Sequence, residues 1–78
     1  MKYGVRFYGD EGLEYLSFAN NGKLTTYRDA RKIALFMDEW EAHLQAKNYL
    51  QQIRKTYFYE IGTITYEEEE TTTNNDFY

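Results

Sequence analysis

The 78-residue sequence contains no cysteine and no proline, and it has a single histidine, His43, and a single serine, Ser17. Without cysteine, the chain cannot form a disulfide or a thiolate metal site. Nucleophilic catalysis requires a nucleophile, a base within reach and a group that orients the base. One serine in a predicted strand and one histidine on a predicted helix do not supply that set. We therefore expect that the protein is not an enzyme.

Metal ligands and phosphate-binding loops are also scarce. Glu39 and His43 are four residues apart on a predicted helix, but one such pair supplies only two ligands. The run Glu67–Glu70 lacks the spacing and the glycine of a calcium-binding loop. The chain has no glycine-rich phosphate loop. We expect no metal and no cofactor.

Long apolar runs are missing as well. No stretch approaches the roughly 18 apolar residues of a membrane-spanning helix. Residues 1–12 lack the apolar segment of a signal peptide. These features predict a soluble, cytoplasmic protein with no membrane partner.

Aromatic residues are abundant, at 19% of the chain, and nine of them are tyrosines. A chain of this length buries only about 60% of the surface that its unfolded form exposes. Each aromatic ring can bury roughly 150–250 Å². We therefore expect the core to be built largely from rings.

Alternation of apolar and polar residues predicts strands at residues 2–8, 13–18 and 56–66. In the first of these, Tyr3, Val5 and Phe7 share one face. The turn at residues 9–12 makes the first two strands antiparallel, and Asn21-Gly22 predicts a second turn before a short strand at residues 23–25.

A helix is predicted to begin at Thr25 or Thr26, either of which can cap it, and to end at about Ala46; Asp29, three residues after Thr26, comes close to completing a capping box. Its buried stripe would be Ala30, Ile33, Ala34, Met37, Trp40 and Leu44. Residues 47–55 fit either a continued helix or a loop. The predicted fold is α+β, an antiparallel sheet of three to five strands packed against one main helix in the order ββ(β)αβ(β). Residues 1–66 would form a single domain and residues 67–78 a mobile acidic tail.

Charge is unevenly distributed within a net charge of −4. Residues 1–35 carry six basic and four acidic residues, whereas residues 36–78 carry three basic and nine acidic ones. The acidic half would repel phosphate backbones and attract a basic protein surface. Aromatic rings near these acids would provide apolar anchors. The predicted partner-binding residues are therefore Asp38, Glu39, Glu41, Glu60, Tyr66, Glu67, Glu68, Glu69, Glu70, Asp76, Phe77 and Tyr78.

Two other interpretations of these residues remain open. The four consecutive glutamates can act only as gatekeepers that keep an aromatic strand soluble. The aromatic strands can also stack nucleic-acid bases, but the net charge opposes such binding, so we expect no direct nucleic-acid contact.

In size and composition, the chain resembles the small phage-encoded anti-defence proteins of the anti-CRISPR and anti-restriction type. It shares with them a short length, an acidic and tyrosine-rich composition and the absence of cysteine and proline. The resemblance implies an inhibitor, located in the host cytoplasm, that blocks the nucleic-acid site of a nuclease or CRISPR effector complex. The alternative is a small assembly module that forms a homodimer through its aromatic strands, and the sequence leaves monomer and homodimer open.

Overall fold

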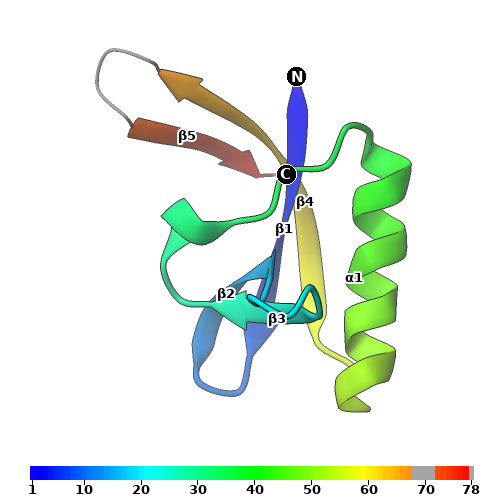
Figure 1. Ribbon diagram of the computed structural model, residues 1–78. Helices are drawn as coiled ribbons and strands as arrows, with labels where there is room; N and C mark the ends of the chain where they lie inside the picture. The colour runs from blue at the N-terminus through cyan, green and yellow to red at the C-terminus, as the bar shows by residue number, and fades with distance from the viewer. Residues whose placement is uncertain (68–71, 78) are drawn as a thin grey trace.

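The computed structural model describes residues 1–67 and 72–77 (Figure 1). These residues form five strands, one short 3₁₀ helix and one α-helix. In chain order they are β1 (Lys2–Gly9), β2 (Gly12–Phe18), β3 (Leu24–Tyr27), η1 (Ala30–Lys32), α1 (Glu39–Ile53), β4 (Phe58–Glu67) and β5 (Thr72–Phe77).

The strands form one antiparallel sheet in the order β3-β2-β1-β4-β5. The helix α1 lies along one face of this sheet, beside β1 and β4 (Figure 1). The predicted α+β class, the number of strands and the position of the helix between the third and fourth strands are therefore confirmed.

The central strand β1 sends alternate side chains to the two faces of the sheet, as its sequence predicts. Val5 pairs with Ile61, and Phe7 pairs with Tyr59, on the face that α1 covers. Val5 and Phe7 are fully buried there. The core has few large rings, and its buried apolar members are Val5, Phe7, Leu16, Ile33, Phe36, Ala42, Ala46, Ile61 and Ile64.

The segment between η1 and α1 joins the two faces of the sheet. Phe36 pairs with Tyr3 as an isolated bridge, with backbone hydrogen bonds of 2.8 and 2.9 Å. The Ala34 backbone N–H donates to the Leu16 carbonyl at 2.8 Å. These bonds fix the point from which the chain enters α1.

The predicted helix boundaries are wrong, and so is the half of the predicted buried stripe that lies at Met37, Trp40 and Leu44, which are exposed; Ile33 is buried as predicted, but it precedes the helix. Asp29 caps the short η1, and Asp38 caps α1 by accepting a hydrogen bond from the Glu41 backbone N–H at 2.7 Å. Residues 47–53 are helical, which settles the open alternative for that part of 47–55. Because the helix begins at Glu39, its buried side is set by Ala42 and Ala46, while Trp40 lies outside the core.

The end of the chain takes part in the sheet. Residues 67–78 were expected to form a tail, but residues 72–77 form β5 and pair with β4 from Gly62 to Glu67. Glu68–Glu70, in the predicted acidic run, and Tyr78 lie outside the described residues.

Candidate functional site

Large apolar side chains are exposed to solvent around the start of α1. Trp40 is 78% exposed, Met37 is 67% exposed and Leu44 is 46% exposed. Trp40 and Leu44 are one helical turn apart on the outer side of α1, and Met37 immediately precedes the cap residue Asp38. Trp40 is the single tryptophan of the chain, and a large exposed apolar side chain makes this region a candidate for an interaction surface.

Three carboxylates surround this apolar group in the sequence. Asp38 is the helix cap, and Glu39 and Glu41 lie in the first turn of α1. Negative charge is favourable there, because the N-terminus of a helix carries a partial positive charge. We call the combined surface of Met37, Asp38, Glu39, Trp40, Glu41 and Leu44 the Trp40 surface.

A second charged cluster lies on the sheet face that is opposite α1. Arg6 Nη2 donates to Glu60 Oε1 at 2.8 Å, and the Tyr8 hydroxyl donates to the same oxygen. These hydrogen bonds, first from Tyr8 and then from Arg6, lower the pKa of the Glu60 carboxyl. The Arg6 guanidinium also lies 4.4 Å from the centre of the Phe77 ring in β5, a cation–π distance.

Exposed rings border this cluster. Phe58 is 69% exposed and lies in contact with Tyr8, with ring centres 5.5 Å apart. Tyr15 contacts Phe77, with ring centres 6.4 Å apart. This face is therefore aromatic, but its central charges are already paired.

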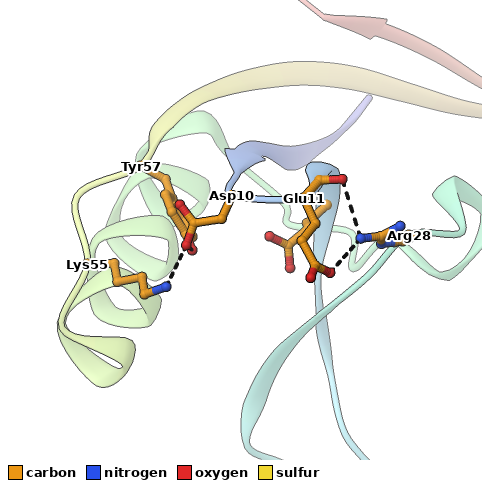
Figure 2. Close-up of a pocket in the computed structure, with 6 residues that line it drawn as sticks. Asp10, Glu11, Arg28, Lys55 and Tyr57 are labelled. Carbon is orange, nitrogen blue, oxygen red and sulfur yellow. Dashed lines mark hydrogen bonds and ion pairs between the residues drawn. The ribbon is translucent and has the colours of Figure 1, made fainter.

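A polar pocket lies at the turn between β1 and β2 (Figure 2), and its volume is about 270 Å³. Lys55 Nζ donates to Asp10 at 2.6 Å, and the Tyr57 hydroxyl donates to the same oxygen at 2.9 Å. These two hydrogen bonds lower the pKa of the Asp10 carboxyl, with Lys55 the larger cause. On the other side, Arg28 pairs with Glu11 at 2.8 Å. The pocket is therefore bordered by two ion pairs. The lining residues are Asp10, Glu11, Glu14, Arg28, Lys55 and Tyr57.

Five of the twelve predicted partner-binding residues lie in two separate clusters. Asp38, Glu39 and Glu41 come together at the start of α1. Glu60 and Phe77 meet at Arg6, on the sheet face opposite α1. The backbones of Tyr66, Glu67 and Asp76 lie in β4 and β5.

Sequence reasoning missed Trp40, Met37 and Leu44 as site residues, because it assigned all three to the core. One sequence signal agrees with the observed helix start: Asp38 is followed three residues later by Glu41, which is the spacing of a capping motif, although Thr26 and Asp29 have the same spacing. With the helix start placed there, the residues after the cap can be assigned to faces correctly.

His43 contacts Tyr59 on the neighbouring strand β4. Its Nδ1 lies 3.1 Å from the Tyr59 hydroxyl, and the two rings pack edge to face. Within residues 1–67 and 72–77, no three histidine, aspartate or glutamate side chains gather in a way that would hold a metal. In the same part of the chain, no helix has the length and apolar character needed to cross a membrane.

Comparisons with family models, with curated proteins and with solved structures gave no match to this chain.

Proposed function

We propose that this protein is a non-catalytic inhibitor that binds another protein through the Trp40 surface and covers that protein's basic nucleic-acid-binding site. The observation that carries the proposal is Trp40, which is 78% exposed in the first turn of α1 and lies between two glutamates in the sequence. Tryptophan is among the residues most enriched in the energetic centres of protein interfaces.

The chemistry of the Trp40 surface fits a site that normally holds nucleic acid. Sites for single strands combine cations that follow the phosphates with apolar or aromatic positions that stack bases. An indole ring bordered by carboxylates offers the same two features, a flat ring and negative charge. The acidic residues also steer the protein toward a basic surface and speed association.

The resemblance in size and composition to phage anti-defence proteins suggests the kind of partner. A nuclease or CRISPR effector complex in the host cytoplasm has the basic groove that the Trp40 surface would occupy. The negative charge of residues 67–70 and 76 adds to the attraction for such a groove.

The test is a DNA-cleavage assay on purified restriction enzymes and CRISPR effector complexes, with and without this protein. We expect cleavage by at least one of them to fall in proportion to added protein, and high salt to weaken the inhibition. Trp40→Ala should abolish inhibition. Phe58→Ala is the matched control, since Phe58 is an exposed ring on the opposite side of the sheet.

Two results would contradict the proposal. One is full cleavage by every enzyme in the presence of excess protein. The other is inhibition that Phe58→Ala removes as completely as Trp40→Ala does.

A second candidate function is assembly through the aromatic strands. The observation that favours it is the exposed pair of Phe58 and Tyr8 on the sheet face opposite α1. Under this alternative, Phe58→Ala would convert a homodimer to a monomer in light scattering, and Trp40→Ala would not.

A further inference from the structure

The outer side of α1 carries side chains spaced as in a coiled coil. Trp40, Leu44, Lys47 and Gln51 follow one another at intervals of four, three and four residues, which keeps them on one helix face. The same pattern continues with Met37, three residues before Trp40, and with Arg54, three residues after Gln51. All six positions are exposed: Met37, Trp40, Leu44, Lys47, Gln51 and Arg54.

This row of side chains differs in character between its two halves. The N-terminal half is apolar and lies beside the carboxylates of the Trp40 surface. The C-terminal half is basic, with Lys47 and Arg54. It borders a hollow of about 410 Å³. The residues that line this hollow are Lys47, Leu50, Gln51, Arg54, Lys55 and Thr56.

We propose that α1 pairs with α1 of a second copy of this chain, antiparallel and about a two-fold axis, so that the Trp40 surface of each copy covers the basic hollow of the other. In this register Trp40 faces Gln51 of the second copy, and Leu44 faces Lys47. Met37 faces Arg54. Each layer joins an a-type position to a d-type position, as antiparallel coiled-coil packing requires.

Charge complementarity selects this orientation over a parallel one. The acidic first turn of one α1 lies beside Lys47 and Arg54 of the other, whereas parallel helices would place acid against acid. Antiparallel helix dipoles add to the preference. The aliphatic stems of Lys47 and Arg54 can cover the indole of Trp40, and their charged ends can lie over its face or at its edge.

The backbone at Arg54 supports a role for its side chain. Arg54 is the C-cap of α1, with φ 56 and ψ 43, a left-handed conformation that favours glycine. An arginine there costs stability, and residues held in such conformations are often functional. In the proposed dimer its guanidinium lies beside the acidic first turn of the second copy.

The symmetry closes the assembly at two copies, because each copy uses the same surface. A helix of 15 residues is only about 22 Å long, so this interface is smaller than the standard size of about 1,200–2,000 Å². We therefore expect a weak dimer, with a dissociation constant in the micromolar range or above. The dimer stands independently of the proposed inhibitor function, but it would hide Trp40, so a partner and a second copy would compete for one surface.

The test uses the full chain in a concentration series from about 1 μM to about 1 mM, a range that brackets the weak affinity expected of so small an interface. Sedimentation equilibrium should show a shift from monomer to dimer. The emission of Trp40, the only tryptophan, should move to shorter wavelength as the dimer forms. A monomer throughout the series would overturn the proposal. A dimer without an emission shift would also overturn it, and would place the interface on another face.

Salt and charge reversal test the orientation. Salt screens the attraction between the acidic and basic halves, so the antiparallel dimer should dissociate more readily as salt is added. A parallel dimer would be stabilised by salt, because salt would screen repulsion between like charges. The variant Glu39→Lys/Glu41→Lys and the variant Lys47→Glu/Arg54→Glu should each be monomeric. A 1:1 mixture of the two should associate. No association in the mixture, with both variants folded by circular dichroism, would count against the antiparallel arrangement.

The substitution Arg54→Gly separates folding from association. Glycine relieves the left-handed conformation, so the midpoint temperature of the monomer should rise. The dimer dissociation constant should increase at least several-fold because the guanidinium is lost. Unchanged dimer affinity in this variant, together with unchanged affinity in Trp40→Ala, would overturn the proposal.

Discussion

Gly4 occupies a position in β1 where a side chain would collide with the segment that leads to α1. A Cβ atom built at Gly4 would lie 2.5 Å from Ile33 Cδ1 and 3.1 Å from both Ile33 Cγ1 and Ile64 Cγ1. Ile33 and Ile64 are both buried, at 4% and 1% exposed. In Gly4→Ala, Ile33 must therefore move, and it has little free space in which to do so.

The sign of the stability change decides whether this packing is correct. In the interior of a strand with room for a methyl group, alanine is more stable than glycine by about 0.5–1 kcal/mol. Inserting a methyl group into a well-packed core costs about 1–3 kcal/mol. We expect the second effect to win and Gly4→Ala to lower the free energy of unfolding by about 1–2 kcal/mol. For a domain of this size, that corresponds to a fall of about 4–16 °C in the midpoint temperature.

A double-mutant cycle with Ile33→Val isolates the contact. The valine lacks the Cδ1 atom that lies closest to the added Cβ, and alone it should cost about 0.5–1.5 kcal/mol. The two substitutions together should cost about 1 kcal/mol less than the sum of the single changes. Urea unfolding followed by far-ultraviolet circular dichroism is the suitable assay, because Trp40 is too exposed to report on the core by fluorescence.

Two outcomes would refute this reasoning. If Gly4→Ala raises the free energy of unfolding, the space above Gly4 is open and Ile33 does not lie there. If the two substitutions are additive, Ile33 is not in contact with the new methyl group. Either result would also mean that the segment from η1 to Asp38 does not lie where the structure places it. The Trp40 surface, which follows that segment, would then be misplaced as well.

Three further predictions concern the core, the helix cap and pH. Phe7→Ala should lower the free energy of unfolding by about 3–5 kcal/mol, whereas Phe58→Ala should change it by less than about 0.5 kcal/mol, as urea titrations can show. Asp38→Ala should cost about 1 kcal/mol in the same assay, because the cap is lost. The pKa of Glu60 is lowered in the folded state, first by Tyr8, so its contribution to stability is complete above its unfolded pKa. This contribution is lost as pH falls through the folded pKa. In Glu60→Gln, the free energy of unfolding should therefore fall less between pH 7 and pH 2 than it does in the original protein.

The strands could be predicted because their sequences alternate and their turns contain glycine. In β1, the alternation of Tyr3, Val5 and Phe7 with polar residues determines which side chains reach the core. A slip of one residue would move all of them to the other face, so the pattern specifies the register. Pairing partners and strand order depend on contacts far apart in sequence, and the sequence indicated only that the sheet is antiparallel.

The end of the chain could not be predicted as a strand, because residues 72–76 have nothing apolar to bury. They join the sheet by backbone pairing with β4. The side chain of Phe77 adds contacts with Arg6 and Tyr15. Since these contacts involve three different strands, no local pattern in the sequence reveals them.

The helix shows how one misplaced boundary hides a candidate site. Two capping patterns compete in the sequence, one at Thr26 with Asp29 and one at Asp38 with Glu41, and local spacing does not choose between them. The earlier start assigns Trp40 to the core, where so large a ring would be expected. The bonds of Ala34 to β2 and of Phe36 to β1 hold residues 33–36 in extended conformation and exclude that start.

The buried side of α1 explains why Trp40 is left exposed. Its fully buried members are Ala42 and Ala46, whose small side chains let the helix lie close to the sheet without a large residue between them. Folding therefore does not require the ring of Trp40. Burying an exposed tryptophan against another protein can release free energy that folding leaves unused. Trp40→Ala should accordingly leave the free energy of unfolding within about 0.5 kcal/mol of the original while it removes binding, and a large loss of stability in this variant would mean that the ring belongs to the core.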